Sequence, residues 1–227
     1  MKGLNERVAV VTGAASGIGR AIANRFAEEG VDVFGVDLQV GDMPENGHLL
    51  DHIQVDLTDE QSTNVILDSL SLHTQKCDIL VNAAGVSEFG LFDDKDRSLF
   101  DRTMAVNLEA VARITRDFLP LLRKSNQGRI INIGSICSEF ASPGLSAYVV
   151  SKHAVLGLTR ALASELGPEG ITVNCIQPGA ILTGITASSF EADPSFKEHW
   201  VNKSAIGRIG QPEDVAPLAC FLASEEA

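Results

Sequence analysis

Residues 7–19 read RVAVVTGAASGIG, in which a short apolar run is followed at once by a glycine-rich turn. The run Arg7–Val11 consists mostly of valine and alanine, which suits a strand buried on both faces. The glycines at positions 13, 17 and 19 let the chain turn sharply and bring backbone N–H groups close to a ligand at the N-terminus of the next helix. The stretch predicts a strand, a turn that holds a pyrophosphate, and a helix.

The alternation of strand and helix continues along the chain. Further β-branched runs occupy 31–36, 52–55, 78–81, 129–133 and 171–176. Helical segments are predicted at 17–29, 59–72, 97–123 and 146–166. Alternating elements of this kind predict an α/β protein, a three-layer doubly wound Rossmann fold with a mostly parallel central sheet. No linker interrupts the pattern, so residues 1–227 are expected to form a single domain.

Composition excludes several classes of protein. The chain is 44% hydrophobic and carries a formal net charge of −12, which argues against a nucleic-acid partner because a phosphate backbone needs a cationic face. The cysteines form no CxxC pair and the histidines lack ligand spacing, so no metal site is expected. The sequence shows neither a secretory leader nor an apolar run of membrane-spanning length, which predicts a cytoplasmic protein with no membrane partner.

One stretch departs from the acidic balance of the chain. Its cations outnumber a lone acid, Asp117, and two interpretations are open. In the first interpretation the cations lie near a helix C-terminus, where they meet the negative end of the helix dipole. In the second they form a docking patch for an acidic partner. The cations are Arg113, Arg116, Arg123, Lys124 and Arg129.

Asp37 stands at the end of the second predicted strand. A carboxylate at this place can accept hydrogen bonds from an adenosine ribose, and it repels a 2′-phosphate. No arginine or lysine lies among Ala14, Ala15 and Ser16 to bind that phosphate. The sequence therefore predicts NAD as the cofactor in preference to NADP. An aspartate in a surface loop is the alternative.

Tyr148 and Lys152 form a second chemical signature, in the stretch AYVVSK at 147–152. Residues four apart on a helix lie on the same face, one turn from each other. A tyrosine with an ordinary pKa of about 10 is a poor proton donor or acceptor at neutral pH. An adjacent ammonium group and a cationic nicotinamide both favour the phenolate and are expected to lower that pKa into the range of general acid–base catalysis.

Together with further motifs, these features resemble the short-chain dehydrogenase/reductase family, in its compact single-domain branch. The motifs follow one another in the family's order from residue 12 to about residue 216, so they cover nearly the whole chain. Ser135 stands 13 residues before Tyr148, the usual spacing in that branch. The motifs are TGAASGIG at 12–19, Asp37, Asp56 in VDLTD, NAAG at 82–85, Asn107, Ser135, YVVSK, and Pro178-Gly179.

The resemblance implies four catalytic residues. Tyr148 is expected to give a proton to a carbonyl, or to take one from a hydroxyl, as hydride moves to or from nicotinamide C4. Lys152 is expected to lower the pKa of Tyr148 and to hold the nicotinamide ribose. Ser135 is expected to bind the substrate oxygen, with Ser138 as the alternative donor. Asn107 is expected to support a water that links Lys152 to solvent, or else to be a capping or core amide.

The resemblance also assigns the cofactor cleft. Asp56 and Leu57 are placed beside the adenine, Gly179 close to the nicotinamide, and Thr183 at its carboxamide. The cofactor-binding residues that the resemblance implies are Gly13, Ser16, Gly17, Ile18, Gly19, Asp37, Asp56, Leu57, Asn82, Ala83, Gly85, Tyr148, Lys152, Pro178, Gly179, Ile181 and Thr183.

The expected substrate is a small or medium secondary alcohol or ketone. One alternative is an enzyme like the 3-oxoacyl-[acyl-carrier-protein] reductases, and a more remote one is a non-catalytic NAD-binding regulatory protein. The candidate substrate-binding residues are Ser135, Cys137, Leu145 and Tyr148, with Val86, Glu88, Phe89 and Phe140 as further residues of the pocket.

Two expectations concern the periphery of the domain. The irregular stretch 184–207 is predicted to be a lid on the substrate side, with a pair of ordinary surface helices as the alternative. The resemblance implies a homotetramer or homodimer formed through 97–123 and 146–166. Members of the family usually continue into a last strand and a glycine-containing tail, which are missing after residue 227 of this sequence.

Overall fold

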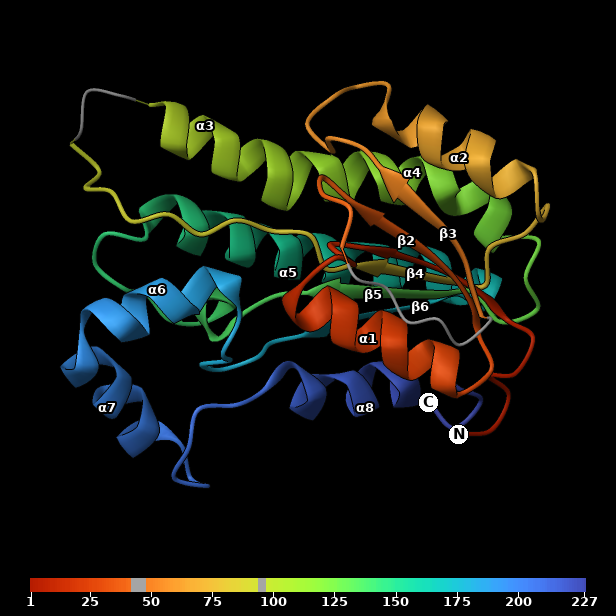
Figure 1. Ribbon diagram of the computed structural model, residues 1–227. Helices are drawn as coiled ribbons and strands as arrows, with labels where there is room; N and C mark the ends of the chain where they lie inside the picture. The colour runs from red at the N-terminus through yellow and green to blue at the C-terminus, as the bar shows by residue number, and fades with distance from the viewer. Residues whose placement is uncertain (42–47, 94–96) are drawn as a thin grey trace.

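The computed structural model of the chain describes residues 1–41, 48–93 and 97–227. Its centre is a six-stranded sheet in the order β3-β2-β1-β4-β5-β6, in which every neighbouring pair is parallel (Figure 1). Strands β1, β4 and β5 are buried along their whole length, as their continuous apolar runs predict. The strands are β1 Val8–Thr12, β2 Asp32–Asp37, β3 Leu49–Gln54, β4 Ile79–Asn82, β5 Arg129–Ile133 and β6 Thr172–Ile176.

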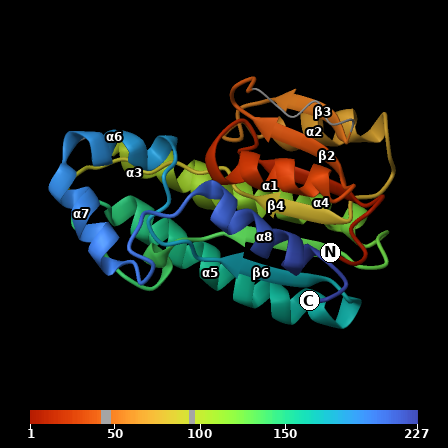
Figure 2. The same cartoon turned by 60° about the horizontal axis from the view of Figure 1, so that its bottom comes forward.

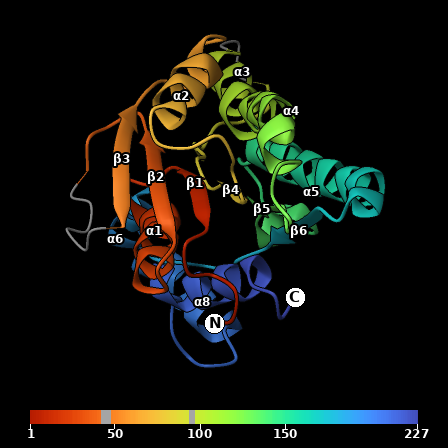
Figure 3. The same cartoon turned by 90° about the vertical axis from the view of Figure 1, so that its right-hand side faces the viewer.

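Helices cover both faces of this sheet (Figures 2 and 3). One face carries α1 (Gly17–Glu28) and α8 (Pro212–Ala223), and the other carries α2 (Ser62–Ser71), α4 (Ala110–Leu122) and α5 (Ser146–Leu166). A separate apolar cluster fills each interface, one around Phe26 and the other around Phe34 and Phe118. The predicted three-layer doubly wound fold is confirmed. None of the helices in the described residues is both long and apolar enough to cross a bilayer.

The helix predicted over 97–123 is not continuous. It consists of α3 (Ser98–Met104), a π-helical turn at Ala105–Glu109, and α4. A π-helical turn holds one more residue than an α-helical turn, so it rotates the side chains that follow it relative to those before it. The turn contains Asn107, and the apolar periodicity of the sequence gave no sign of it.

The position of the site is set by the point where the strand order reverses. Strand β1 pairs with β2 on one side and with β4 on the other, so after β1 and after β4 the chain continues toward opposite sides of the sheet. The Thr12 hydroxyl accepts hydrogen bonds from the N–H groups of Ala83 and Ala84, both at 3.1 Å. A Cβ at Gly13 would lie 2.8 Å from Ala84 Cα. The two loops touch because residue 13 has no side chain.

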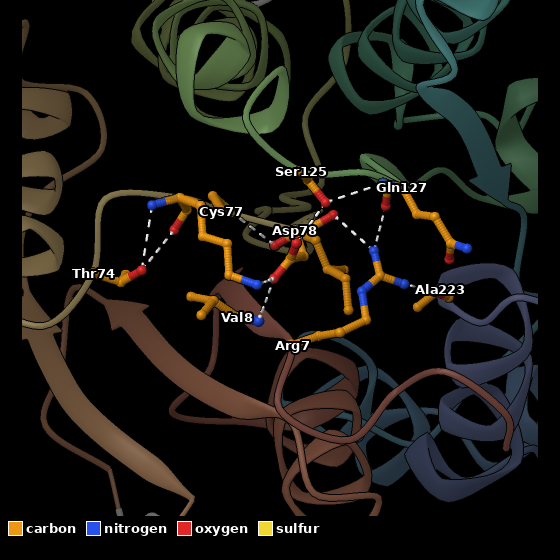
Figure 4. Close-up of polar contacts among 10 residues, drawn as sticks. Arg7, Val8, Thr74, Cys77, Asp78, Ser125, Gln127 and Ala223 are labelled. Atoms are coloured by element: carbon orange, nitrogen blue, oxygen red, sulfur yellow. Dashed lines mark hydrogen bonds and ion pairs between the residues drawn. The ribbon is translucent and has the colours of Figure 1, made fainter.

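A buried polar network lies at the opposite end of the central strands, where β1 and β4 begin (Figure 4). The Arg7 guanidinium donates hydrogen bonds to the main-chain carbonyls of Asp78, Gln127 and Ala223. The Asp78 carboxylate accepts from the N–H of Val8 at 2.9 Å. The network joins the starts of β1 and β4 to the end of α8, which fixes that helix against the sheet.

The five cations of 113–129 do not form one surface, so the interpretation as a docking patch is wrong. Arg129 is buried and donates to the carbonyl of Ser224 at 3.1 Å. Arg113 points into the loop after β3, while Arg123 pairs with Glu169 at 2.6 Å. Only Arg123 and its neighbour Lys124 lie at the C-terminus of α4, as the other interpretation expected.

Candidate active site

A cleft of about 640 Å³ opens at the carboxyl ends of the strands, above the point where the strand order reverses. Its walls are the loops that follow all six strands, together with α3, the π-helical turn and the first turns of α1, α5 and α6 (Gly184–Ala192). Every residue assigned to the cofactor from the sequence lines this cleft except Asn82.

Asn82 lies below the floor of the cleft. Its side-chain amide donates to Asn132 Oδ1 at 2.8 Å and to Thr115 Oγ1 at 3.1 Å. The side chain is buried, and these bonds join β4 to β5 and to α4. Asn82 therefore supports the floor of the cleft from within the sheet.

The glycine-rich turn fits a pyrophosphate. Gly13 and Gly17 have φ of +70° and +53°, and a Cβ at Gly19 would lie 2.1 Å from the carbonyl oxygen of Gly13. Ser16, the N-cap of α1, makes no side-chain capping hydrogen bond, so N–H groups of the first turn remain free for an anion. Close backbone approach and free donors at a helix N-terminus are what a pyrophosphate needs.

Two aspartates fix the adjoining wall. Asp37 accepts hydrogen bonds from the N–H of Ala15 at 2.9 Å and from the N–H of Gln39 at 3.1 Å, which holds its carboxylate at the edge of the cleft. Asp56 accepts from both the N–H and the hydroxyl of Thr58, each at 2.8 Å. These hydrogen bonds lower the pKa of Asp56 below its ordinary value, because they stabilise the carboxylate. The wall therefore presents fixed carboxylates to a ligand.

The catalytic candidates meet at the other end of the cleft. Helix α5 begins at Ser146 and so places Tyr148 and Lys152 one turn apart in its first two turns. Lys152 Nζ lies 5.6 Å from the centre of the Tyr148 ring and donates to the carbonyl of Ile133 at 2.7 Å. Both side chains line the cleft, as does Ser135. Their placement brings a hydroxyl, a phenol and an ammonium together.

The structure corrects one expectation about these groups. The sequence predicts a lowered pKa for Tyr148, but in the chain by itself burial raises it, and a hydrogen bond with Ser135 opposes the rise only in part. Burial also lowers the pKa of Lys152 to about 8. Desolvation of the phenol is the largest of the effects on the pKa of Tyr148. In the protein alone, Tyr148 is protonated at neutral pH.

The two candidate serines have different surroundings. Ser138 accepts a hydrogen bond from the N–H of Ser135 at 3.2 Å and donates to the carbonyl of Lys152 at 2.9 Å. Its hydroxyl is therefore engaged within the fold, and Ser138 does not line the cleft. Ser135 lines it and is the serine that a substrate oxygen can reach.

Asn107 acts as a clamp between two walls. Its amide accepts from the N–H of Val86 at 2.8 Å and donates both to the carbonyl of Val86 at 2.9 Å and to the Ser151 hydroxyl at 3.1 Å. A Cβ at Gly85 would lie 3.3 Å from Asn107 Oδ1 and 3.6 Å from Lys152 Nζ, so Gly85 packs closely beside both groups. The amide is used inside the protein, which agrees with the core-amide interpretation, and the water relay stays a prediction.

Of the four expected substrate residues, only Ser135 and Tyr148 line the cleft. Neither Cys137 nor Leu145 lines the cofactor cleft: Cys137 is buried and donates its N–H to Ser135 Oγ, and Leu145 forms a β-bridge with Gly90. Phe89 packs its ring against Gly144, where a Cβ would lie 2.0 Å from a ring carbon. These contacts join the loop after β4 to the loop before α5, and Phe89 remains 73% exposed.

The stretch predicted as a lid folds into a helix pair. Helix α6 is followed by α7 (Pro194–Lys203), and the rings of Phe190, Phe196 and Trp200 form an aromatic row between them. In Figure 1 the pair projects beyond the carboxyl ends of the strands. Closure of this pair over the substrate stays a prediction.

Several residues of the cleft were not found from the sequence. Gln39 lies two residues after Asp37 and Thr58 directly follows Leu57, so the extension of known motifs could have found them. Arg102 has no such signal, because it lies on α3 and reaches the cleft only through the packing of that helix. It forms an ion pair with Glu88 at 3.2 Å. The cleft residues that were not found from the sequence include Gln39, Thr58, Arg102, Val106, Gly134 and Thr186.

The buried Lys152 makes the stability of the fold depend on pH. Its pKa is about 8 in the folded chain and 10.5 as an ordinary lysine, so between these values the unfolded chain holds a proton that the folded chain has released. The free energy of unfolding therefore rises with pH across this window. We expect the wild-type protein to gain about 2 kcal/mol more than Lys152→Met between pH 7 and pH 9.5. Urea unfolding at both pH values measures the difference, and equal gains in the two proteins would contradict the prediction.

Known protein families match this chain over almost its whole length. A family model described as "Enoyl-(Acyl carrier protein) reductase" matches residues 13–227. The 3-oxoacyl-[acyl-carrier-protein] reductase of Thermotoga maritima is 32% identical over 231 residues, which covers 99% of this chain and 93% of the relative. The human dehydrogenase/reductase SDR family member 4 is 35% identical over 233 residues, covering 99% and 83%.

Solved structures agree with these matches. The ligand-free aldohexose dehydrogenase of Thermoplasma acidophilum superposes with a TM-score of 0.91 at 32% identity, covering 99% of this chain and 89% of the other. The 3-ketoacyl-(acyl-carrier-protein) reductase of Brucella melitensis, complexed with NADH, gives 0.87 at 29% identity, covering 99% and 93%. With the glycine-rich turn, the cleft and the group of Ser135, Tyr148 and Lys152 in place, the chain belongs to the short-chain dehydrogenase/reductase family.

Proposed function

We propose that this member of the family is an NAD-preferring dehydrogenase or reductase that interconverts a secondary alcohol and a ketone, with Tyr148 as general acid and base. The observation that carries the proposal is the meeting of Ser135, Tyr148 and Lys152 at one end of a cleft whose other end carries Asp37. A protein that only bound the nucleotide would have no use for this group of three.

The geometry supports a division of labour between the three residues. When bound, the nicotinamide cofactor supplies or accepts the hydride. Ser135 hydrogen-bonds the substrate oxygen and stabilises negative charge that develops there. Tyr148, protonated in the protein alone, gives its proton to that oxygen during reduction and recovers one during oxidation. Lys152 presents its ammonium beside the phenol, 5.6 Å from the ring centre, and favours the phenolate after the proton has left.

A free alcohol or ketone is the favoured substrate. Ile185, which is 44% exposed, lines the cleft, and the exposed rings of Phe89 and Phe140 lie on the loops after β4 and β5. These apolar side chains suit a neutral substrate with an apolar part. An acyl group carried on a carrier protein is the second candidate, because relatives with that activity match the whole chain. The net charge of −12 and the dispersal of the cations of 113–129 weigh against an acidic carrier.

A panel of secondary alcohols with NAD and of ketones with NADH tests the proposal directly, by the absorbance of the reduced cofactor. The panel includes a 3-oxoacyl group both as a free small thioester and on a carrier protein. Turnover of free substrates supports the proposal, and turnover confined to the carrier-linked form establishes the second candidate. Absence of turnover across the panel, with intact NADH binding, would favour the non-catalytic alternative.

The cofactor preference gives a separate prediction. Asp37 is held in place by the N–H groups of Ala15 and Gln39, so a 2′-phosphate would have to approach a fixed anion. We expect NADH to bind at least about tenfold more tightly than NADPH, which corresponds to about 1.4 kcal/mol. Asp37→Ser should reduce this ratio to about threefold or less, mainly by improving NADPH binding. Isothermal titration measures all four constants, and tighter binding of NADPH by the wild-type protein would refute the preference.

A further inference from the structure

The loop that follows β3 forms one wall of the cleft at the edge of the sheet. Asp56, Leu57 and Thr58 all line the cleft there. Strand β3 is the last strand on its side, so no neighbouring strand in the described sheet lies beyond it to support this loop. Local turns shape the loop, since Asp59 N–H donates to the Asp56 carbonyl at 3.1 Å. Such turns set the shape of the loop but not its distance from the rest of the site.

Arg113 of α4 reaches this loop from the far side of the cleft wall. Its Nη2 donates to the carbonyl of Leu57 at 2.5 Å, to the carbonyl of Asp59 at 3.1 Å, and to the Ser62 hydroxyl at 3.0 Å. These oxygens are more than 50 residues away in sequence. Among the residues that the structure describes, no carboxylate forms an ion pair with Arg113. The guanidinium is therefore bound by the oxygens of the loop after β3.

The same helical stretch also holds the catalytic end of the cleft. Asn107 lies six residues before Arg113, in the π-helical turn that leads into α4, and clamps the main chain of Val86. The start of this stretch is therefore hydrogen-bonded to the loop after β4 through Asn107, and its next turns are hydrogen-bonded to the loop after β3 through Arg113. The helix sets the separation of two walls that no strand pairing connects directly.

We propose that Arg113 is a positioning residue that sets the adenosine wall of the cofactor cleft. The inference rests on the proposed placement of adenosine beside Asp56 and Leu57. Loss of the guanidinium releases the carbonyls of Leu57 and Asp59 to solvent, so the wall moves while the rest of the cleft keeps its shape. The effect is therefore confined to ligands that carry adenosine.

The test measures binding of NADH and of its two halves, ADP-ribose and reduced nicotinamide mononucleotide, by isothermal titration. Arg113→Met keeps the aliphatic length of the side chain and removes the donors. It should weaken NADH and ADP-ribose by about tenfold, the equivalent of one charged hydrogen bond, and leave the mononucleotide within about twofold. Arg116→Met is the matched control, because Arg116 is an exposed arginine of the same helix that pairs with Asp117, and all three ligands should bind it as they bind wild type.

Arg113→Lys keeps the charge and one donor group and should recover most of the lost affinity, which also covers the case in which Arg113→Met does not fold. Unchanged ADP-ribose binding in Arg113→Met, or equal weakening of both halves, would overturn the proposal. If both Arg113 variants fail to fold while Arg116→Met folds, the role is structural and the proposal also fails. Failure of the wild-type protein to bind NADH is a different result, because it would reject the proposed function itself.

Discussion

Replacing Tyr148 by phenylalanine is expected to lower kcat by about 10²- to 10⁴-fold. The substitution removes only the hydroxyl, which is the group that exchanges a proton with the substrate oxygen. Tyr148 is the only tyrosine in the chain, and the hydroxyl of Ser138, which lies outside the cleft, already donates to the Lys152 carbonyl at 2.9 Å. Ser135 and Lys152 also line this part of the cleft, but Lys152 Nζ donates to the Ile133 carbonyl at 2.7 Å and Ser135 is proposed to hold the substrate oxygen, so we expect neither to replace the phenol in full.

The measurement is steady-state kinetics with the best substrate of the panel, together with NADH titration. NADH affinity should change by no more than about threefold, because the ring that packs 5.6 Å from Lys152 Nζ is kept. A Tyr148→Phe protein with wild-type turnover would remove Tyr148 from the mechanism. A large loss of NADH affinity would instead show that the hydroxyl acts mainly in binding.

Gly19→Ala is expected to destabilise the fold by about 3 kcal/mol or more, or to abolish NADH binding by displacing the glycine-rich turn. A Cβ at this position would lie 2.1 Å from the carbonyl oxygen of Gly13 and 3.1 Å from that of Thr12. Both contacts are with the main chain, so a change of rotamer cannot relieve them. Relief requires a shift of the turn whose N–H groups face the cleft.

Gly157→Ala is the matched control, since Gly157 also lies in a helix but a Cβ added there would meet no neighbouring element within 4 Å. This change should be neutral or stabilising by up to about 1 kcal/mol, because alanine favours the helical backbone. Chemical unfolding and NADH titration of both variants measure the contrast. Equal behaviour of Gly19→Ala and wild type in both measurements would show that the turn is looser than the structure indicates.

Much of the fold could be predicted because its signals are local. Strand β5 covers 129–133 and α5 covers 146–166, as the sequence predicted, since an apolar run or a helical periodicity is legible within a short window. The glycine-rich turn is equally local. Its position after β1 places it at the carboxyl end of a parallel sheet, which is where doubly wound folds bind their ligands.

Other parts of the site depend on contacts between distant segments. The π-helical turn at Ala105–Glu109 interrupts a helix that the sequence predicts as continuous, and the Asn107 clamp on Val86 joins residues 21 apart. Arg113 was assigned from the sequence to a cationic cluster, yet its hydrogen bonds are with the loop after β3. No short window of sequence contains both partners of these contacts.

The sequence by itself determined the order of strands and helices, the phosphate turn, the acid at Asp37 and the pairing of Tyr148 with Lys152 on one helical face. The tertiary structure decided which serine faces the cleft, how α4 holds both walls, and the direction in which the pKa of Tyr148 shifts. The physical reason is that periodicity and turn chemistry act over a few residues, whereas burial is a property of the assembled chain. The spacing of Tyr148 and Lys152 favours the phenolate, but desolvation, which only packing creates, outweighs that tendency in the folded protein alone and keeps the pKa of Tyr148 raised.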